Sequence, residues 1–192
     1  PERHYLAEAP AAFEDGTLDY LNIPAIEIGL RHIERVGYEK IHERVRCLTG
    51  WLLDNLVEIK HANGKPLVKI YGPVTTEQRG GAIALNFVDP YGNVIDHRSI
   101  EQNANKKEIS LRTGCFCNPG AGELALGISS SELTSCFNHP EHDQRLTYDE
   151  FRLCIDGKAS GAVRISVGLV SNFDDIEHFL EFIRGMVKVV AQ

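Results

Sequence analysis

The segment from Arg112 to Gly120, RTGCFCNPG, holds the residues of this chain that are best suited to chemistry. Two thiols, Cys115 and Cys117, lie between Gly114, which permits a sharp turn, and Asn118–Gly120, which predicts a second turn. A cysteine reacts as its thiolate, and a nearby cation or the N–H groups at a helix N-terminus favour that form. We therefore take this loop as the functional centre and Cys117 as its candidate reactive group.

Arg112 and the start of a following helix are placed to supply those favourable charges. The two thiols are also compatible with less specific roles. Free cysteines are often small, partly buried residues without chemistry. A CxC pair with no second Cys/His pair at ligand spacing is a poor zinc signature, and redox chemistry is a weaker third possibility.

Two further positions are candidates for binding. Arg164, near the start of the apolar run AVRISVGL, offers a bidentate fork to a carboxylate. An edge-strand arginine with a packed stem and a hydrated head explains it equally well. In FEDGT, Gly16 and Thr17 offer backbone donors and a hydroxyl to a phosphate, although a simple turn or helix cap fits the same residues.

Composition excludes several classes of protein. The 192 residues carry 20 Lys+Arg against 27 Asp+Glu, a formal net charge of −7, and no basic cluster of the kind that a nucleic-acid backbone demands. Apolar runs are interrupted by charges before the ~18 residues of a membrane span, and no secretory signal is visible. The five cysteines are odd in number and irregular in spacing, so we expect reduced thiols in a cytoplasmic protein.

The elements that position these residues follow from hydrophobic periodicity. Apolar residues at three- and four-residue steps predict helices over 23–56, broken near Gly37. The same reasoning places Trp51 in the core rather than in a binding role. Short β-rich runs predict strands at 68–72, 81–89, 108–114 and 162–169.

Further helices are expected at 94–105, at 123–129, and after Asn172 as a plausible N-cap, with a polar excursion over 129–161. These elements indicate an α+β fold, a small mostly antiparallel sheet covered by helices. The first residues read as an extended arm and, lacking a Met, indicate a segment of a longer protein.

With these positions in order, the sequence resembles the class V aminotransferase-fold family of pyridoxal-phosphate enzymes, in its cysteine desulfurase branch. FEDGT resembles that family's Phe-Glu-x-Gly-Thr segment, RTGCFC its Arg-Thr-Gly-x-x-Cys loop, and VRISVGLVSNFDDIEHFL its closing strand and helix. The loop is most similar to that of the desulfurase domain of molybdenum-cofactor sulfurases, where a cysteine stands in place of Gly122.

The resemblance implies roles for particular residues. Cys117 would accept sulfur as a persulfide, and Arg164 would bind the substrate carboxylate with Arg112 near the same pocket. Gly16 and Thr17 would reach the phosphate of pyridoxal 5'-phosphate held by the other subunit of a homodimer. Cys115 receives no role. The substrate would be L-cysteine or another amino acid.

The resemblance also implies a division of the chain, into an arm and connecting helix (1–30) that belongs to a large pyridoxal-phosphate domain and a C-terminal small domain (31–192). The Schiff-base lysine of the family lies upstream of the FEDGT segment, and nothing here matches it. We therefore expect the isolated chain to be inactive and to hold no cofactor firmly. An aminotransferase, lyase or epimerase of the same fold, or a non-catalytic sulfur carrier, are the alternatives.

Overall fold

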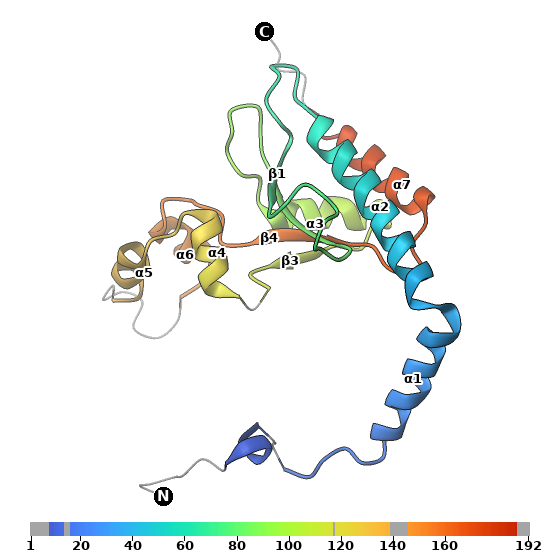
Figure 1. Ribbon diagram of the computed structural model, residues 1–192. Helices are drawn as coiled ribbons and strands as arrows, with labels where there is room; N and C mark the ends of the chain where they lie inside the picture. The colour runs from blue at the N-terminus through green and yellow to red at the C-terminus, as the bar shows by residue number, and fades with distance from the viewer. Residues whose placement is uncertain (1–7, 14–15, 117, 139–145, 188–192) are drawn as a thin grey trace, which may run out of the picture. The chain divides into compact units, whose positions relative to one another are not determined.

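The structure is a computed structural model that describes residues 8–13, 16–116, 118–138 and 146–187 (Figure 1). The chain divides into two compact units, Pro1–His42 and Glu43–Gln192. The candidate loop, Arg164 and the sheet lie in the second unit, whereas Gly16 and Thr17 lie in the first.

The first unit contains a short 3-10 helix, η1 (Ala9–Phe13), and helix α1 (Ile23–Val36). Gly37 follows α1 with a φ of 97°, a backbone conformation that glycine adopts without a steric penalty. Helix α2 (Tyr38–Glu58) begins directly afterwards. The predicted break at Gly37 is therefore confirmed.

The second unit is built on a four-stranded sheet in the order β1-β2-β4-β3, in which every neighbouring pair is antiparallel. Its strands are β1 (Val68–Tyr71), β2 (Ala82–Phe87), β3 (Arg112–Gly114) and β4 (Ala162–Ser166). The predicted α+β class with a small antiparallel sheet is thus confirmed. Strand β3 is shorter than predicted, since only its last three residues pair with β4.

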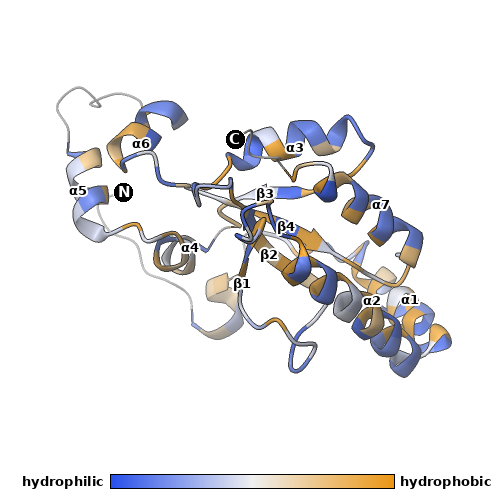
Figure 2. Ribbon diagram, turned by 90° about the horizontal axis from the view of Figure 1, so that it is seen from above, coloured by the Kyte–Doolittle hydropathy of each residue, from blue (hydrophilic) through white to orange (hydrophobic). Residues whose placement is uncertain are grey.

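One face of the sheet is covered by α2, by α3 (His97–Asn105) and by α7 (Phe173–Arg184). Alternate strand residues point to this side, because side chains alternate between the two faces of a strand. The core combines leucines of α2, the apolar stripe of α7 and the inward residues of the strands. Figure 2 shows the matching alternation of hydrophobic and hydrophilic residues along α7.

Capping residues define where the covering helices begin. The Asn172 side chain accepts a hydrogen bond from the Asp175 N–H, while the Asp175 carboxylate accepts one from the Asn172 N–H. Each satisfies a backbone donor that the first turn of a helix leaves unpaired. The predicted N-cap at Asn172 is therefore confirmed. Helix α3 begins after Asp96, later than predicted.

Three short helices, α4 (Pro119–Leu126), α5 (Ser130–Phe137) and α6 (Tyr148–Cys154), lie on the other side of the sheet from α2 and α7 (Figures 1 and 2). Helix α4 begins earlier than predicted, because Asn118 caps its N-terminus. It also ends earlier, because Gly127 adopts a left-handed conformation that stops it. Helices α5 and α6 fall within the predicted polar excursion, where capping boxes start them.

Two expectations about single residues were wrong. Cys136 and Cys154 form a disulfide, against the expectation of reduced thiols, because α5 and α6 bring together two cysteines that lie 18 residues apart. Trp51 is 46% exposed and packs edge-on against Phe173 instead of entering the core, since Leu48 and Leu52 take the inward side of α2.

Candidate functional site

A row of directly opposed residues crosses the sheet face that lies opposite to α2, α3 and α7. Tyr71 pairs with Ala84, Ala84 with Arg164, and Arg164 with Arg112. Directly opposed residues of antiparallel strands point to the same face. Both predicted binding arginines therefore lie side by side on the face opposite to α2, α3 and α7.

The two arginines form a concentration of positive charge. Arg112 and Arg164 are both exposed, and neither makes an ion pair or a hydrogen bond to any residue that the structure describes. The Arg164 guanidinium carbon lies 5.5 Å from the centre of the Phe116 ring. Like charges directly across a strand pair repel each other, so the arrangement favours an anion that both guanidinium groups can bind.

The cysteine loop leaves the sheet next to this pair. Gly114 ends β3 with a φ of 113°, and Phe116 has a φ of 55°, which is uncommon for a residue with a bulky side chain. Cys115 is a free, exposed thiol. The Asn118 side chain caps α4 by accepting a hydrogen bond from the Ala121 N–H at 3.4 Å. The predicted sharp turn at Gly114 is thus confirmed, whereas Asn118–Gly120, predicted as a second turn, is the start of helix α4.

Cys117, the predicted nucleophile, lies outside the described residues. Its neighbours on both sides, Phe116 and Asn118, line a common pocket. The assignment of Cys117 therefore stays a prediction from the sequence, and the structure describes the surroundings of the loop that carries it.

That pocket has a volume of about 390 Å³ and lies between the sheet face that carries the arginines, the cysteine loop, α4 and α6. Its floor includes Tyr71 and Ala84 of the sheet row, and most of its lining is apolar. The Ser160 hydroxyl, also in the lining, is buried without a hydrogen-bond partner among the described residues. Pockets of this size with a few polar groups are typical of small-molecule sites.

Beneath the loop, Gly161 brings three segments into close contact. A Cβ atom at Gly161 would lie 2.9 Å from the His97 ring and 3.0 Å from the Gly114 Cα. The Asn86 side-chain amide donates to the Gly161 carbonyl at 3.2 Å and to the Tyr71 hydroxyl at 3.0 Å. Only a glycine permits this approach, which fixes β4 against the turn that carries the cysteines.

Burial changes the titration of two groups at this junction. It raises the pKa of the Tyr71 hydroxyl, with the Asn86 hydrogen bond opposing the shift. Burial also lowers the pKa of His97, which Asp96 partly offsets. Both groups are therefore held in their neutral forms over a wide range of pH.

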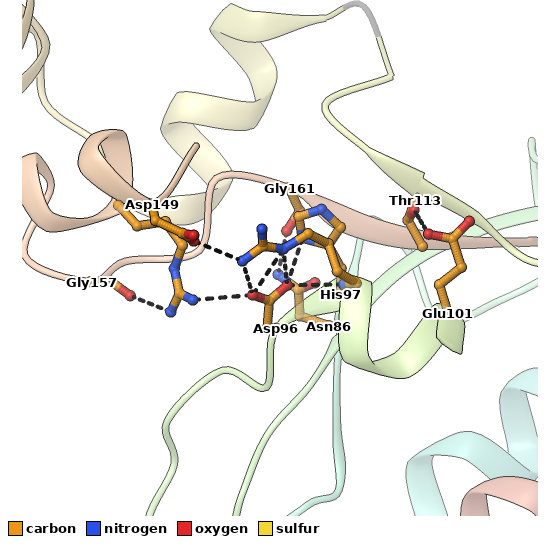
Figure 3. Close-up of polar contacts among 10 residues, drawn as sticks. Asn86, Asp96, His97, Glu101, Thr113, Asp149, Gly157 and Gly161 are labelled. Carbon is orange, nitrogen blue, oxygen red and sulfur yellow. Dashed lines mark hydrogen bonds and ion pairs between the residues drawn. The ribbon is translucent and has the colours of Figure 1, made fainter. Parts of the chain in front are cut away.

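A polar cluster around Asp96 joins this junction to α6 (Figure 3). The Asp96 carboxylate accepts from Arg98 at 2.7 Å and from Arg152 of α6 at 3.1 Å. Arg98 also donates to Asp149 at 3.1 Å and stacks on the Tyr148 ring at 3.8 Å. The Arg98 guanidinium holds the pKa of Asp96 down to about 2.

A separate hydrogen bond holds the strand that precedes the loop. The Thr113 hydroxyl donates to the Glu101 carboxylate of α3 at 3.0 Å (Figure 3). Thr113 pairs with the buried Val163, so it lies on the sheet face opposite to Arg112 and Arg164. Thr113 belongs to the Arg-Thr-Gly motif, so its side chain anchors the motif from the helix side, while Gly114 after it lines the pocket.

Sequence reasoning missed Asn86, Asp96, His97, Glu101 and Gly161. Asp96 carried a readable signal, because an Asp directly before a helical stretch is a preferred N-cap. The others carried none, since their roles depend on contacts between segments far apart in the chain.

Gly16 and Thr17 are exposed residues of the first unit, and Gly16 has a φ of 81°. Their predicted contact with a cofactor phosphate stays a prediction. No group of His, Cys, Asp and Glu side chains suited to a metal ion occurs among the described residues. In the same part of the chain, no helix is both long and apolar enough to cross a membrane.

The donor set around the pocket does not fit pyridoxal phosphate by itself. No lysine is among the described residues that line it, and its charged lining residue is the carboxylate Glu123, which would repel a phosphate. Lys69 donates to the carbonyl of the lining residue Ala125 at 3.4 Å, and its ammonium group lies over the Tyr71 ring. We therefore derive no step through the cofactor from these residues.

The sequence of this chain matches the model of one protein family over most of its length. That model describes the aminotransferase class-V family and matches residues 2–179. The chain belongs to this family, whose enzymes depend on pyridoxal phosphate.

Two curated relatives are molybdenum cofactor sulfurases. The molybdenum cofactor sulfurase of Homo sapiens is 36% identical over 176 residues, which cover 89% of this chain and 19% of that protein. The molybdenum cofactor sulfurase of Solanum lycopersicum is 34% identical over 173 residues, which cover 90% of this chain and 20% of that protein. The chain thus spans about a fifth of the length of these relatives.

A solved structure supports the fold. The apo cysteine desulfurase from Thermococcus onnurineus NA1 superposes with a TM-score of 0.58 at 20% sequence identity. The match covers 96% of this chain and 35% of that one. At this identity the likeness concerns the fold.

Proposed function

We propose that this chain is the segment of a pyridoxal-phosphate-dependent cysteine desulfurase or sulfurase that carries the sulfur-accepting thiol, Cys117, and the arginines that bind the substrate carboxylate. The observation that carries the proposal is the direct opposition of Arg112 and Arg164 beside the cysteine loop. Two exposed guanidinium groups that have no ion-pair or hydrogen-bond partner among the described residues suit the carboxylate of an amino acid.

The net reaction converts L-cysteine and the Cys117 thiol into alanine and a Cys117 persulfide. The Cys117 thiolate forms a bond to the substrate sulfur as the carbon–sulfur bond breaks, and the electron pair of that bond, with a proton, ends on the β-carbon of alanine. The bound cofactor supplies the electron sink that makes this cleavage possible. Arg164 and Arg112 orient the amino acid by its carboxylate.

The proposal includes partners outside this chain. A large domain of the same protein would hold the cofactor and its lysine, and Gly16 and Thr17 would contact the cofactor phosphate of the second subunit in a homodimer. Helix α1 fits such a connecting role, because none of its residues is buried and it presents large apolar side chains, among them Ile26, Ile28 and Leu30.

The test uses the longer protein that the proposal requires, loaded with pyridoxal phosphate and given L-cysteine. We expect release of alanine, a persulfide on Cys117 found by mass spectrometry, and loss of both in Cys117→Ala. Cys47→Ala is the matched control, because Cys47 is a free, exposed thiol on α2. An unchanged rate of alanine release in Cys117→Ala would contradict the proposal.

The proposed role of Arg164 in carboxylate binding is tested by the KM for L-cysteine. Arg164→Ala should raise KM for L-cysteine by on the order of 10- to 100-fold, since a hydrogen bond to a charged group contributes about 1.5–3 kcal/mol. Arg164→Lys should recover only part of this loss, because lysine lacks the planar fork. Activity on another amino acid that persists in Cys117→Ala would instead indicate an aminotransferase, lyase or epimerase, and persulfide transfer to Cys117 without cofactor would indicate a sulfur carrier.

A further inference from the structure

The disulfide between Cys136 and Cys154 joins two helices on the pocket side of the sheet. Cys136 lies in α5 and is 2% exposed, and Cys154 is the last residue of α6 and is partly buried. Cys47 and Cys115 are free and exposed. The bond therefore links cysteines at one particular junction, and it does so in a chain whose other described thiols remain reduced.

This junction includes helix α6, which contributes Phe151 to the lining of the pocket. Phe151, one helical turn before Cys154, lines the pocket together with Cys115. Residues three apart lie on the same side of a helix. On α5, Phe137 follows Cys136, and its ring centre lies 6.1 Å from that of Phe151. The disulfide and the contact between the Phe137 and Phe151 rings thus both link α5 to α6 beside Phe151.

The two helices are attached to the rest of the unit in different ways. Helix α6 is tied to the Asp96 cluster through Arg152 and Asp149. Helix α5 is held near its N-terminus by Lys158, which pairs with Glu132 at 2.5 Å and donates to the Gly127 carbonyl at 2.8 Å. Near the C-terminus of α5, the disulfide attaches Cys136 covalently to Cys154 of α6. Breaking that bond would therefore leave the C-terminal end of α5 without its covalent link to α6, held there by non-covalent contacts such as that of Phe137 with Phe151, while α6 stays anchored.

We propose that the Cys136–Cys154 disulfide is a redox switch that sets how firmly Phe151 closes the pocket beside Cys115. In the oxidised state α5 supports the Phe151 wall. In the reduced state the C-terminal end of α5 separates, Phe151 loses the ring behind it, and the pocket and loop become more accessible. The consequence for sulfur transfer rests on the function proposed above.

The co-reactant is a dithiol. One of its thiolates attacks the Cys154 sulfur, which is the more exposed of the two, and Cys136 leaves as a thiolate that takes up a proton. The second thiol of the reductant then displaces Cys154 and closes the reductant's own disulfide. Two electrons and two protons pass to the protein, and the dithiol is oxidised.

The test titrates the 192-residue chain in mixtures of reduced and oxidised dithiothreitol, with mass spectrometry to count thiols and to locate the alkylated cysteines. We expect the oxidised chain to be lighter by two hydrogens, with the bond at Cys136 and Cys154. On reduction, alkylation of Cys115 should become faster by about threefold or more, and amide exchange of 148–154 should rise with it.

Variants separate the switch from general effects of the reductant. Cys136→Ser with Cys154→Ser should show the fast alkylation of Cys115 in every mixture, whereas Cys47→Ser should behave as the wild-type chain. If the double variant does not fold, reversal of the wild-type change on reoxidation decides the question. The proposal is overturned if the bond is absent in the oxidised chain, or if reduction leaves both rates unchanged. Neither readout depends on desulfurase activity, so the two proposals fail separately.

Discussion

Arg112 and Arg164 oppose each other directly across β3 and β4, on the sheet face that carries the pocket. An isolated pair of this kind is destabilising, by roughly 0.2–1 kcal/mol for directly opposed like charges. The pair becomes favourable when an anion lies between the two guanidinium groups. This single relationship links the fold to the proposed binding of a carboxylate.

The first prediction concerns this anion site and needs no enzymatic activity. Sulfate should raise the melting temperature of the wild-type chain more than chloride does at equal ionic strength, because it can bridge both arginines. Sulfate also stabilises proteins in general by exclusion from their surface. The decisive quantity is therefore the part of the increase that Arg112→Ala with Arg164→Ala removes, measured by thermal unfolding. Lys106→Ala, which removes an exposed cation elsewhere, should retain the full increase.

The second prediction concerns the close contact under the cysteine loop. Gly161→Ala should lower the free energy of unfolding by about 1–3 kcal/mol, since its new methyl group would press on His97 and on the Gly114 backbone. Gly122→Ala is the control, because it lies within α4 with no atom near its added Cβ, and it should be neutral or stabilising by about 0.5–1 kcal/mol. Equal effects of the two substitutions in urea unfolding would contradict the role given to Gly161.

The third prediction is a dependence on pH. Because the folded pKa of Asp96 is lowered to about 2 from its usual 3.8, its ionised form stabilises the fold above pH 4, and this contribution is lost as the pH falls towards 2. Asp96→Asn should therefore cost about 1 kcal/mol at neutral pH, allowing for partial solvent screening. The gap between the two chains should shrink between pH 4 and pH 2 in urea unfolding. A constant gap over that range would mean that the charge of Asp96 does not matter.

The fourth prediction tests the core beneath the sheet. Leu56 of α2 is fully buried, so Leu56→Ala should lower the free energy of unfolding by about 2–5 kcal/mol through lost burial and a cavity. Leu124 of α4 is 88% exposed, and Leu124→Ala should change the free energy of unfolding by less than about 0.5 kcal/mol. Comparable losses in guanidinium unfolding would show that Leu124 of α4 is buried in solution.

The local signals that could be read from the sequence were those that depend on near neighbours. Periodicity located α1, α2 and α7, and β-rich runs located all four strands. The helix break at Gly37 and the N-cap at Asn172 followed from the conformational and hydrogen-bonding preferences of single residues. Helices α5 and α6 were missed because they are short, polar and lack a strong apolar period.

The chemical types at the site were also set by the sequence. Two thiols on a turn-rich loop, an arginine before them and another in a later strand were visible without any structure. Their order along the chain carried the family resemblance, which the family match from residue 2 to 179 then confirmed.

Tertiary structure decided which of these residues share a surface. The register of β3 on β4 opposes Arg112 to Arg164, and a shift by one residue would send them to opposite faces. The contact of Gly161 with His97 and the disulfide of Cys136 with Cys154 likewise join segments that are distant in sequence. Such pairings depend on the whole packed chain, because only the burial of one sheet face against α2, α3 and α7 fixes what the other face presents.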